Sequence, residues 1–185
     1  MYQCSLVAGK LCLTFVCCIF GLCPQVTGLK HINVGQVAAG MHHSMCLNLT
    51  GSQVYTWGRK DYGQLGHGEA NRDADAGEFV STPALVKFPA LDGPKVHLFT
   101  DIACGDHTSM ALTVDHDLYT WGFEATTGHA KYHNKDLGLP MKLNVNDSLQ
   151  KRDNTSTAVV YKIACGGQHA AVLVKRFAAS NSNLI

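Results

Sequence analysis

The stretch Ile102-Ala-Cys-Gly-Asp-His-Thr-Ser-Met-Ala-Leu112 occurs in three versions along this chain. The earlier version is Val37-Ala-Ala-Gly-Met-His-His-Ser-Met-Cys-Leu47, and the later one is Ile163-Ala-Cys-Gly-Gly-Gln-His-Ala-Ala-Val-Leu173. The first two versions are each followed by an aromatic string, Val54-Tyr-Thr-Trp-Gly58 and Leu118-Tyr-Thr-Trp-Gly122. The starting positions 37, 102 and 163 are almost evenly spaced, and such a period is typical of proteins built from stacked structural repeats.

Each version predicts two short strands with a glycine between them. The first strand is apolar and ends at Gly40, and Gly105 and Gly166 take the same place in the other versions. Glycine permits a backbone bend or a positive φ at such a point. The second strand is expected at Ser44–Asn48 in the first unit and at Ser109–Thr113 in the second.

An aromatic strand follows the hairpin and ends at Trp57-Gly58 or at Trp121-Gly122. Tyrosine and tryptophan suit a half-buried strand, so both tryptophans are expected to pack inside the fold. In the first unit a turn is predicted at 61–66, a polar loop at 69–81 and a fourth strand around 84–87. Four strands per unit is the content of a propeller blade. The sequence therefore predicts an all-β fold with about two and a half blades of four antiparallel strands.

Composition limits the classes of partner. Hydrophobic residues make up 46% of the 185 residues and charged residues 16%, which provides a core and argues against a disordered chain. The formal net charge is +1, so no general basic field exists to attract nucleic acid. We therefore predict no direct DNA site.

The eight cysteines do not have the spacing of a metal site. Five of them lie in the segment 1–23, and no Cys-x-x-Cys pair occurs. Cys104 and Cys165 occupy the same repeat position beside a glycine, which indicates packing. Phosphate-binding, dinucleotide-binding, serine-nucleophile and metalloprotease motifs are also missing from the sequence. We predict no metal, no cofactor, no small-molecule substrate and no covalent chemistry.

The chain divides into a non-repeat segment at 1–23, propeller repeats at 24–175 and a tail at 176–185. Leu11–Cys23 is an apolar run of signal-peptide size preceded by Lys10. It is either a true signal peptide within 1–28, which would make the protein secreted, or an artefact of the gene model. Secretion would make the three Asn-x-Ser/Thr sequences, at Asn48, Asn146 and Asn154, potential glycan sites.

Three strings in the chain resemble the repeats of the regulator of chromosome condensation family. They are Gly40-Met-His-His-Ser-Met-Cys-Leu47, Val54-Tyr-Thr-Trp-Gly58 and Tyr62-Gly-Gln-Leu-Gly66. The resemblance covers about residues 24–175 and implies the C-terminal part of a seven-bladed propeller. The second unit departs from the pattern, because its histidine comes one residue early and its Gly122–Gly128 segment lacks Tyr-Gly-Gln-Leu-Gly.

The resemblance also implies a function. The namesake of the family is the nuclear guanine-nucleotide exchange factor for the small GTPase Ran, and it docks on nucleosomes. The chain is therefore expected to be nuclear, to contact a Ran-type GTPase, and to reach histones and chromatin through the complete protein. It would act in nucleocytoplasmic transport, chromosome condensation and mitosis. The alternative is a non-exchanging interaction module of the scaffold, ubiquitin-ligase or ciliary kind.

Candidate residues follow from the motifs. The family's GTPase-contacting histidine falls by position on His42, and Arg59 and Lys60 lie in a loop suited to a partner. His107 and His169 are expected to hydrogen-bond between blades. Asp115–Asp117 is expected to be a solvated hairpin and Lys131–Thr157 a loop. The remaining repeated residues are expected to be structural: Gly40, His43, Trp57, Gly58, Gly105, Trp121, Gly122 and Gly166.

Overall fold

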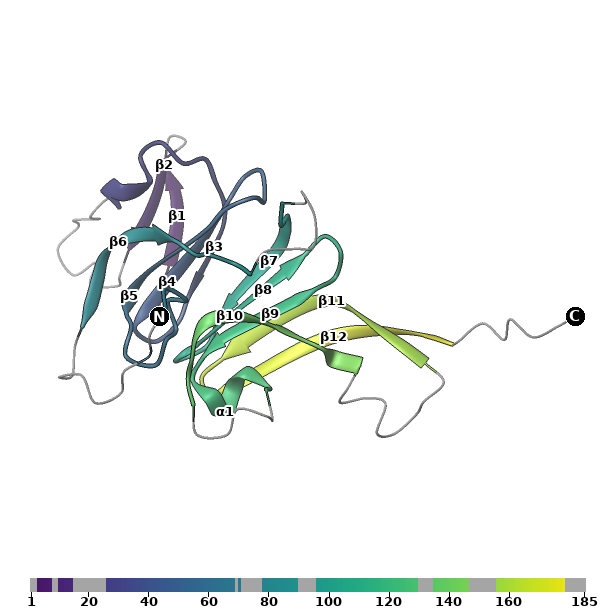
Figure 1. The fold of residues 1–185 in the computed structure, drawn as a ribbon. Coiled ribbons are helices and arrows are strands. Elements are labelled where there is room, and N and C mark those ends of the chain that lie inside the picture. Colours follow the sequence, from purple (N-terminus) through teal and green to yellow (C-terminus); the bar gives the residue numbers. More distant parts are fainter. Residues whose placement is uncertain are drawn as a thin grey trace, which may run out of the picture.

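The structure is a computed structural model. It describes residues 3–7, 10–14, 26–68, 70, 78–89, 96–129, 135–146 and 156–178. Antiparallel sheets dominate this part of the chain. From residue 34 onward, sheets that follow one another in the sequence also lie next to one another in space (Figure 1).

Two four-stranded sheets form complete blades. The first has the order β3(Val34–Ala39), β4(His43–Asn48), β5(Val54–Arg59) and β6(Phe79–Leu85), and all neighbours are antiparallel. The second is the equivalent meander β7(Phe99–Cys104), β8(Thr108–Thr113), β9(Leu118–Gly122) and β10(Leu137–Leu143). We refer to these sheets as blade 1 and blade 2.

The third repeat forms a two-stranded hairpin, β11(Ser156–Gly166) and β12(His169–Ala178). The predicted all-β fold of two and a half four-stranded blades is therefore confirmed. Short helices occur at η2(Thr27–Leu29) and α1(Glu124–Thr127). A further hairpin, β1(Gln3–Val7) with β2(Lys10–Thr14), lies in the segment expected not to match the repeat, and β2 includes the start of its apolar run.

The outer strands differ from the sequence prediction. β10 lies inside the segment 131–157, which was expected to be a loop, and β6 begins at Phe79 rather than near residue 84. Both strands are sheet edges, and both carry a proline, Pro83 or Pro140, where the pairing register shifts. Proline is tolerated in a strand at an edge or a bulge, because no ladder hydrogen bond is lost there.

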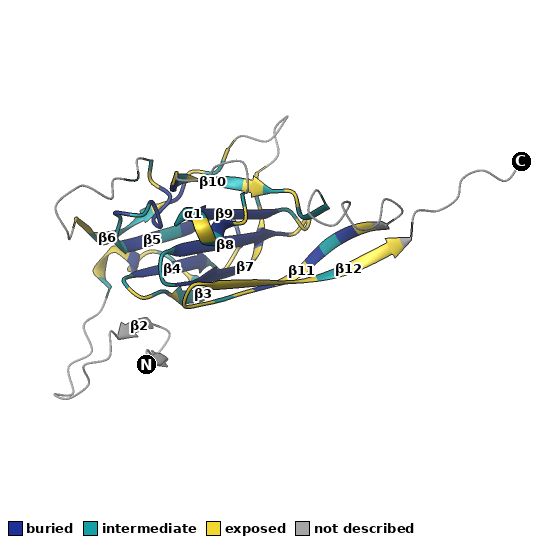
Figure 2. Ribbon diagram, turned by 90° about the horizontal axis from the view of Figure 1, so that it is seen from below, coloured by how far each residue is buried: buried dark blue, intermediate teal, exposed yellow. Residues whose placement is uncertain are grey.

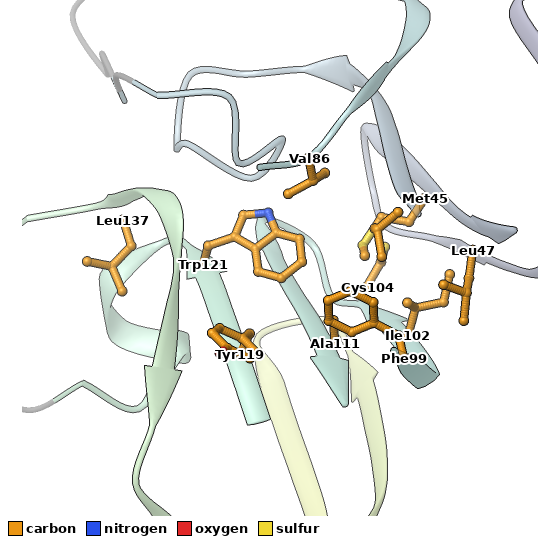
Figure 3. Packing of buried hydrophobic residues seen from close by; sticks show 11 residues of the cluster. Met45, Leu47, Val86, Phe99, Ile102, Cys104, Ala111, Tyr119, Trp121 and Leu137 are labelled. Carbon is orange, nitrogen blue, oxygen red and sulfur yellow. The ribbon is translucent and has the colours of Figure 1, made fainter. Parts of the chain in front are cut away.

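The main core lies between the two blades. It combines Met45, Leu47 and Val54 of blade 1 with a larger set of blade 2 residues, and Val86 joins it from the connection between the blades. Trp121 is fully buried at its centre, with Val86 on one side and Tyr119 on the other (Figure 3). The phenyl ring of Phe88 stands edge-on to the rings of Tyr119 and Trp121. Packing between blades is thus the principal source of hydrophobic burial.

Glycine after tryptophan has a backbone role in both blades. Gly58 and Gly122 have φ values of 113° and 106°, which L side chains rarely adopt. A Cβ atom on Gly58 would overlap the carbonyl oxygen of His42, and one on Gly122 would overlap that of His107. The repeated Trp-Gly string therefore lets the third strand of each blade approach the turn that precedes the second strand.

The outer face of the β11–β12 hairpin is exposed. Leu173 is 65% exposed, whereas its repeat equivalents Leu47 and Leu112 are 3% and 2% exposed. Figure 2 shows the contrast, because β12 is mostly exposed while β8 and β9 are buried. The inner face packs on blade 2 through residues such as Val160 and Ile163.

Two of the three potential glycan asparagines use their side chains inside the fold. The amide of Asn48 donates to Ser52 and Gln53, and its oxygen accepts both of their backbone N–H groups. Asn146 makes a two-way amide contact with the backbone of Ala158. A glycan replaces one Nδ2 hydrogen, so on Asn48, whose amide donates to both Ser52 and Gln53, it would remove one of these bonds. Asn154 lies outside the described residues.

Candidate functional site

The loops that join the first strand to the second, and those that follow the third strand, gather at one end of the blades. The backbone N–H of Arg59 donates to the carbonyl of His42 over 2.9 Å, and that of Phe123 donates to the carbonyl of His107 over 2.9 Å. These equivalent bonds fix His42 beside the Arg59-Lys60 loop. The structure therefore brings together the three residues proposed for partner contact, and we call this end the loop face.

Ion pairs hold the basic residues of the loop face in place. The guanidinium of Arg59 donates to Oδ2 of Asp61 through Nε at 2.7 Å and lies 2.6 Å away through Nη2. Asp61 is buried and also accepts from the side-chain amide of Gln64. Lys60 pairs with Glu78 at 2.5 Å, and both side chains are exposed. Arg59 is thus rigidly positioned, while the Lys60 pair is open to competition from a partner's carboxylate.

A hydrogen-bond network beneath the loop face joins the two blades. Nε2 of His43 lies 2.8 Å from Oγ of Ser109, which donates to the carbonyl of Gln64 over 2.8 Å. Nε1 of Trp121 donates to the same carbonyl over 3.0 Å. The Tyr62-Gly-Gln-Leu-Gly66 turn of blade 1 therefore supplies a backbone acceptor to two side chains of blade 2.

The network assigns the tautomer of His43. The single hydroxyl proton of Ser109 is used toward Gln64, so Nε2 of His43 must donate to the serine oxygen. Nδ1 then carries the lone pair, and it has no hydrogen-bond partner in the described part of the chain. Burial lowers the pKa of His43 to about 3, and the neighbouring imidazoles of His107 and His42 contribute to that shift.

Aromatic rings from both blades line the loop face. The ring of His107 lies 4.3 Å from that of Tyr62 and 6.2 Å from that of His42, measured between centroids. Phe123 meets Tyr62 edge-on at 5.6 Å. Desolvation lowers the pKa of His107, although the nearby carboxylates of Asp61 and Asp106 oppose the shift. His107 therefore connects the blades by ring packing; the hydrogen bond that we expected of it is made by His43.

A second pair of histidines, His67 and His129, was not predicted from the sequence. Oγ1 of Thr56 donates to the carbonyl of Leu65 and lies 2.8 Å from Nε2 of His67. Thr120 repeats the arrangement in blade 2, where it donates to Thr127 and lies 2.9 Å from Nε2 of His129. The signal was present as a Gly-His pair in each of the two units, Gly66-His67 and Gly128-His129.

Other predicted residues lie away from the loop face or at its margin. Trp57 is buried beside Cys46 and Leu29, and His169 is exposed at the start of β12.

His116 adopts a positive φ of 66° and contacts the carbonyl of Val160 through Nδ1 at 2.8 Å. The Asp115–Asp117 turn was expected to be solvated only, but its histidine reaches across to the next hairpin.

The loop face presents side chains suited to binding. Imidazoles, an anchored guanidinium and aromatic edges occupy fixed positions above a buried network, so a partner would meet a preorganised surface. Within the described ranges, no cluster of three histidine, cysteine or acidic residues has the geometry for a metal ion. The described helices are all too short to cross a bilayer.

Comparison with known proteins gives consistent matches to one repeat family. The family model described as "Regulator of chromosome condensation (RCC1) repeat" matches residues 52–112, which run from just before β5 to the last residue but one of β8. The matched repeat therefore spans the junction between blade 1 and blade 2.

Curated relatives align with most of the chain. Human E3 ubiquitin-protein ligase HERC2 is 36% identical over 152 residues, covering 81% of this chain and 3% of that protein. The ultraviolet-B receptor UVR8 of Arabidopsis thaliana is 29% identical, covering 82% and 30%. Human regulator of chromosome condensation is 30% identical over 139 residues, covering 75% and 28%. The chain thus spans less than a third of each of these relatives.

Solved structures support the same fold. The crystal structure of Prp20p from Saccharomyces cerevisiae matches with a TM-score of 0.59 at 23% identity, covering 82% of this chain and 33% of that one. Human WBSCR16 matches with a TM-score of 0.56 at 24% identity, covering 82% and 35%.

Proposed function

Since this chain is a member of the regulator of chromosome condensation repeat family, we propose that its loop face is a docking surface for a small GTPase of the Ran type and promotes nucleotide exchange. Its partial propeller would work in the nucleus as part of a guanine-nucleotide exchange factor. The observation that carries the proposal is the clustering of His42 with Arg59 and Lys60 on a rigid, two-blade junction.

The proposed mechanism needs no covalent step. A GTPase holds its nucleotide through a phosphate-binding loop, a lysine and Mg²⁺. A surface that binds the nucleotide-free form more tightly than the loaded form weakens that hold, and the difference in affinity limits the effect. The half-buried imidazole of His42 can form a hydrogen bond with a group in a switch region of the GTPase. The Arg59–Asp61 ion pair holds the adjoining loop in one conformation when the partner binds.

Support for these partners comes from relatives. Prp20p, which shares the fold, was described together with its binding properties to Gsp1p and histones. On this basis we extend the proposal to histones, which the complete protein would contact outside the loop face.

A second candidate function is a protein-interaction module without exchange activity. Its support is the similarity to HERC2 and UVR8, whose identities of 36% and 29% bracket the 30% of human regulator of chromosome condensation. A module of this kind would use the same loop face for a partner that is not a GTPase.

His42→Ala tests the exchange proposal. We expect the wild-type chain to accelerate release of fluorescent GDP from Ran, and the variant to lose about tenfold of that acceleration, equivalent to about 1.4 kcal/mol of transition-state stabilisation. His31→Ala serves as the matched control, because His31 is an exposed histidine that precedes β3.

Three outcomes separate the candidates. Equal release rates for wild type and His42→Ala would remove His42 from the site. Binding to nucleotide-free Ran without acceleration would favour the non-exchanging module. Lack of any Ran binding by the folded chain would reject the GTPase proposal.

A further inference from the structure

The chain contains a single serine or threonine that precedes a proline, and it lies in β6. This dipeptide is Thr82-Pro83; the other prolines follow cysteine, phenylalanine, glycine or leucine. β6 is the outermost strand of blade 1, and in the described part of the chain it pairs with β5 alone (Figure 1). The residue before a proline is restricted to extended backbone, and proline-directed serine/threonine kinases select this dipeptide in extended segments. Thr82 therefore has the sequence context of a phosphate acceptor.

Thr82 lies in a bulge of the strand pairing. Along β6 the regular pairing with β5 breaks after Val80 and resumes at Ala84, and the intervening residues lie opposite Trp57 alone. Ser81 and Thr82 are consecutive and both exposed, whereas the side chains of a regular strand alternate between its two faces. The backbone around Thr82 therefore bulges out of the sheet at a free edge, where the cleft of a kinase can reach it.

The bulge combines an anchored proline with a free threonine. Gly28 of η2 packs so closely against the ring of Pro83 that a Cβ atom on this glycine would lie 2.8 Å from Cδ. The hydroxyl of Thr82 has no hydrogen-bond partner among the described residues. By contrast, the buried hydroxyl of Thr56, on the neighbouring strand, donates to the carbonyl of Leu65. Phosphorylation of Thr82 would therefore break no side-chain hydrogen bond of the described fold, while Pro83 keeps the segment in place.

We propose that Thr82 is a phosphorylation site for a proline-directed serine/threonine kinase. The hydroxyl oxygen of Thr82 attacks the γ-phosphorus of ATP and forms a phosphate ester, as the bond from that phosphorus to the bridging oxygen breaks. ADP leaves, and the hydroxyl proton passes to the catalytic base of the kinase. Pro83 supplies the specificity, and the bulge presents the hydroxyl. The site does not depend on the GTPase proposed for the loop face.

The phosphate would change the character of the free edge of β6. Phe79 and Leu85 are 59% and 46% exposed, so this edge is apolar at both ends. An exposed apolar edge strand can pair with a strand of another chain, and charged groups on the edge oppose such pairing. A phosphothreonine carries a charge of about −1.5 to −2 at pH 7. Phosphorylation at the bulge would therefore protect this edge from association with other chains.

The test uses the full 185-residue chain, ATP labelled at the γ-phosphate and a purified cyclin-dependent kinase, which is proline-directed. We expect label on Thr82, located by peptide mass mapping, at an initial rate within about tenfold of that for a synthetic peptide of residues 78–87. Thr82→Ala is expected to remove the label, and Thr82→Ser is expected to retain it. Pro83→Ala should lower the initial rate by about tenfold or more, although the hydroxyl is still present.

Two matched control variants test whether the labelling is specific. Ser81→Ala removes the neighbouring exposed hydroxyl, and Thr50→Ala removes an exposed threonine that precedes a glycine in the β4–β5 turn. Both should be labelled like wild type, and circular dichroism of each variant checks folding. Absence of label on the folded chain would overturn the proposal, and labelling of the peptide alone would show that the fold conceals the site. Label that persists in Thr82→Ala, or that is unchanged in Pro83→Ala, would overturn it as well.

Discussion

Alanine at Gly40 is expected to lower the free energy of unfolding by about 3 kcal/mol or more, whereas alanine at Gly166 should change it by less than about 1 kcal/mol. The two glycines hold the same repeat position, and neither has a positive φ. A Cβ atom on Gly40 would overlap the carbonyl oxygen of Gly105 and lie 2.6 Å from Nδ1 of His43. On Gly166 it would have no atom within 4 Å. The difference between the two variants in free energy of unfolding therefore measures how much stability depends on the close approach of one blade to the next.

The third member of the series predicts an intermediate value. A Cβ atom on Gly105 would lie 2.8 Å from the carbonyl oxygen of Gly167, at the junction with the β11–β12 hairpin, so its overlap is less severe than that of a Cβ atom on Gly40. Urea unfolding followed by circular dichroism measures all three variants on one scale. We expect the order of destabilisation to be Gly40, then Gly105, then Gly166. Equal losses of unfolding free energy at the three sites would mean that glycine is needed for the local backbone conformation and not for the packing of one blade on the next.

The sequence could predict those parts of the fold that repeat. The strands around Gly40 and Gly105 and the Trp-Gly strands were predicted. Each of these sequence patterns occurs in both units, and residues that recur at the same place in two units indicate an element that every blade contains. β10 was missed because Gly138 and Pro140 are poor strand residues. Their tolerance depends on an edge position and a register shift, which are properties of the assembled sheet.

The site was predictable only in part. The adjacency of His42 to Arg59 follows from the repeat, but their connection is a backbone bond that no side-chain motif reveals. The acceptor that joins the blades is likewise a main-chain carbonyl, that of Gln64. His107 and His169 were predicted to hydrogen-bond between blades, whereas in the structure Nε2 of His43 makes such a bond, to Oγ of Ser109 in the next blade. Which of two neighbouring histidines faces the next blade is decided by strand geometry.

Acid is expected to destabilise this junction through His43. Its pKa is about 3 in the folded chain and 6.5 when unperturbed, because burial disfavours the imidazolium form. Between these values the unfolded chain binds a proton that the folded chain does not, so stability is fully present above pH 6.5 and is lost as pH falls toward 3. Within that window the loss is about 1.4 kcal/mol per pH unit.

His43→Gln separates this histidine from the other titrating groups. The glutamine amide can donate to Oγ of Ser109 but cannot take up a proton in this pH range. Burial also lowers the pKa values of His67 and His129, whose effects have the same sign and cancel in the difference between the two proteins. We expect the stability advantage of wild type over the variant, measured by urea unfolding, to be constant above pH 7 and to shrink between pH 6 and 4. A difference that stays constant down to pH 4 would show that His43 accepts a proton without breaking the junction, and the buried, unpartnered Nδ1 would then need another explanation.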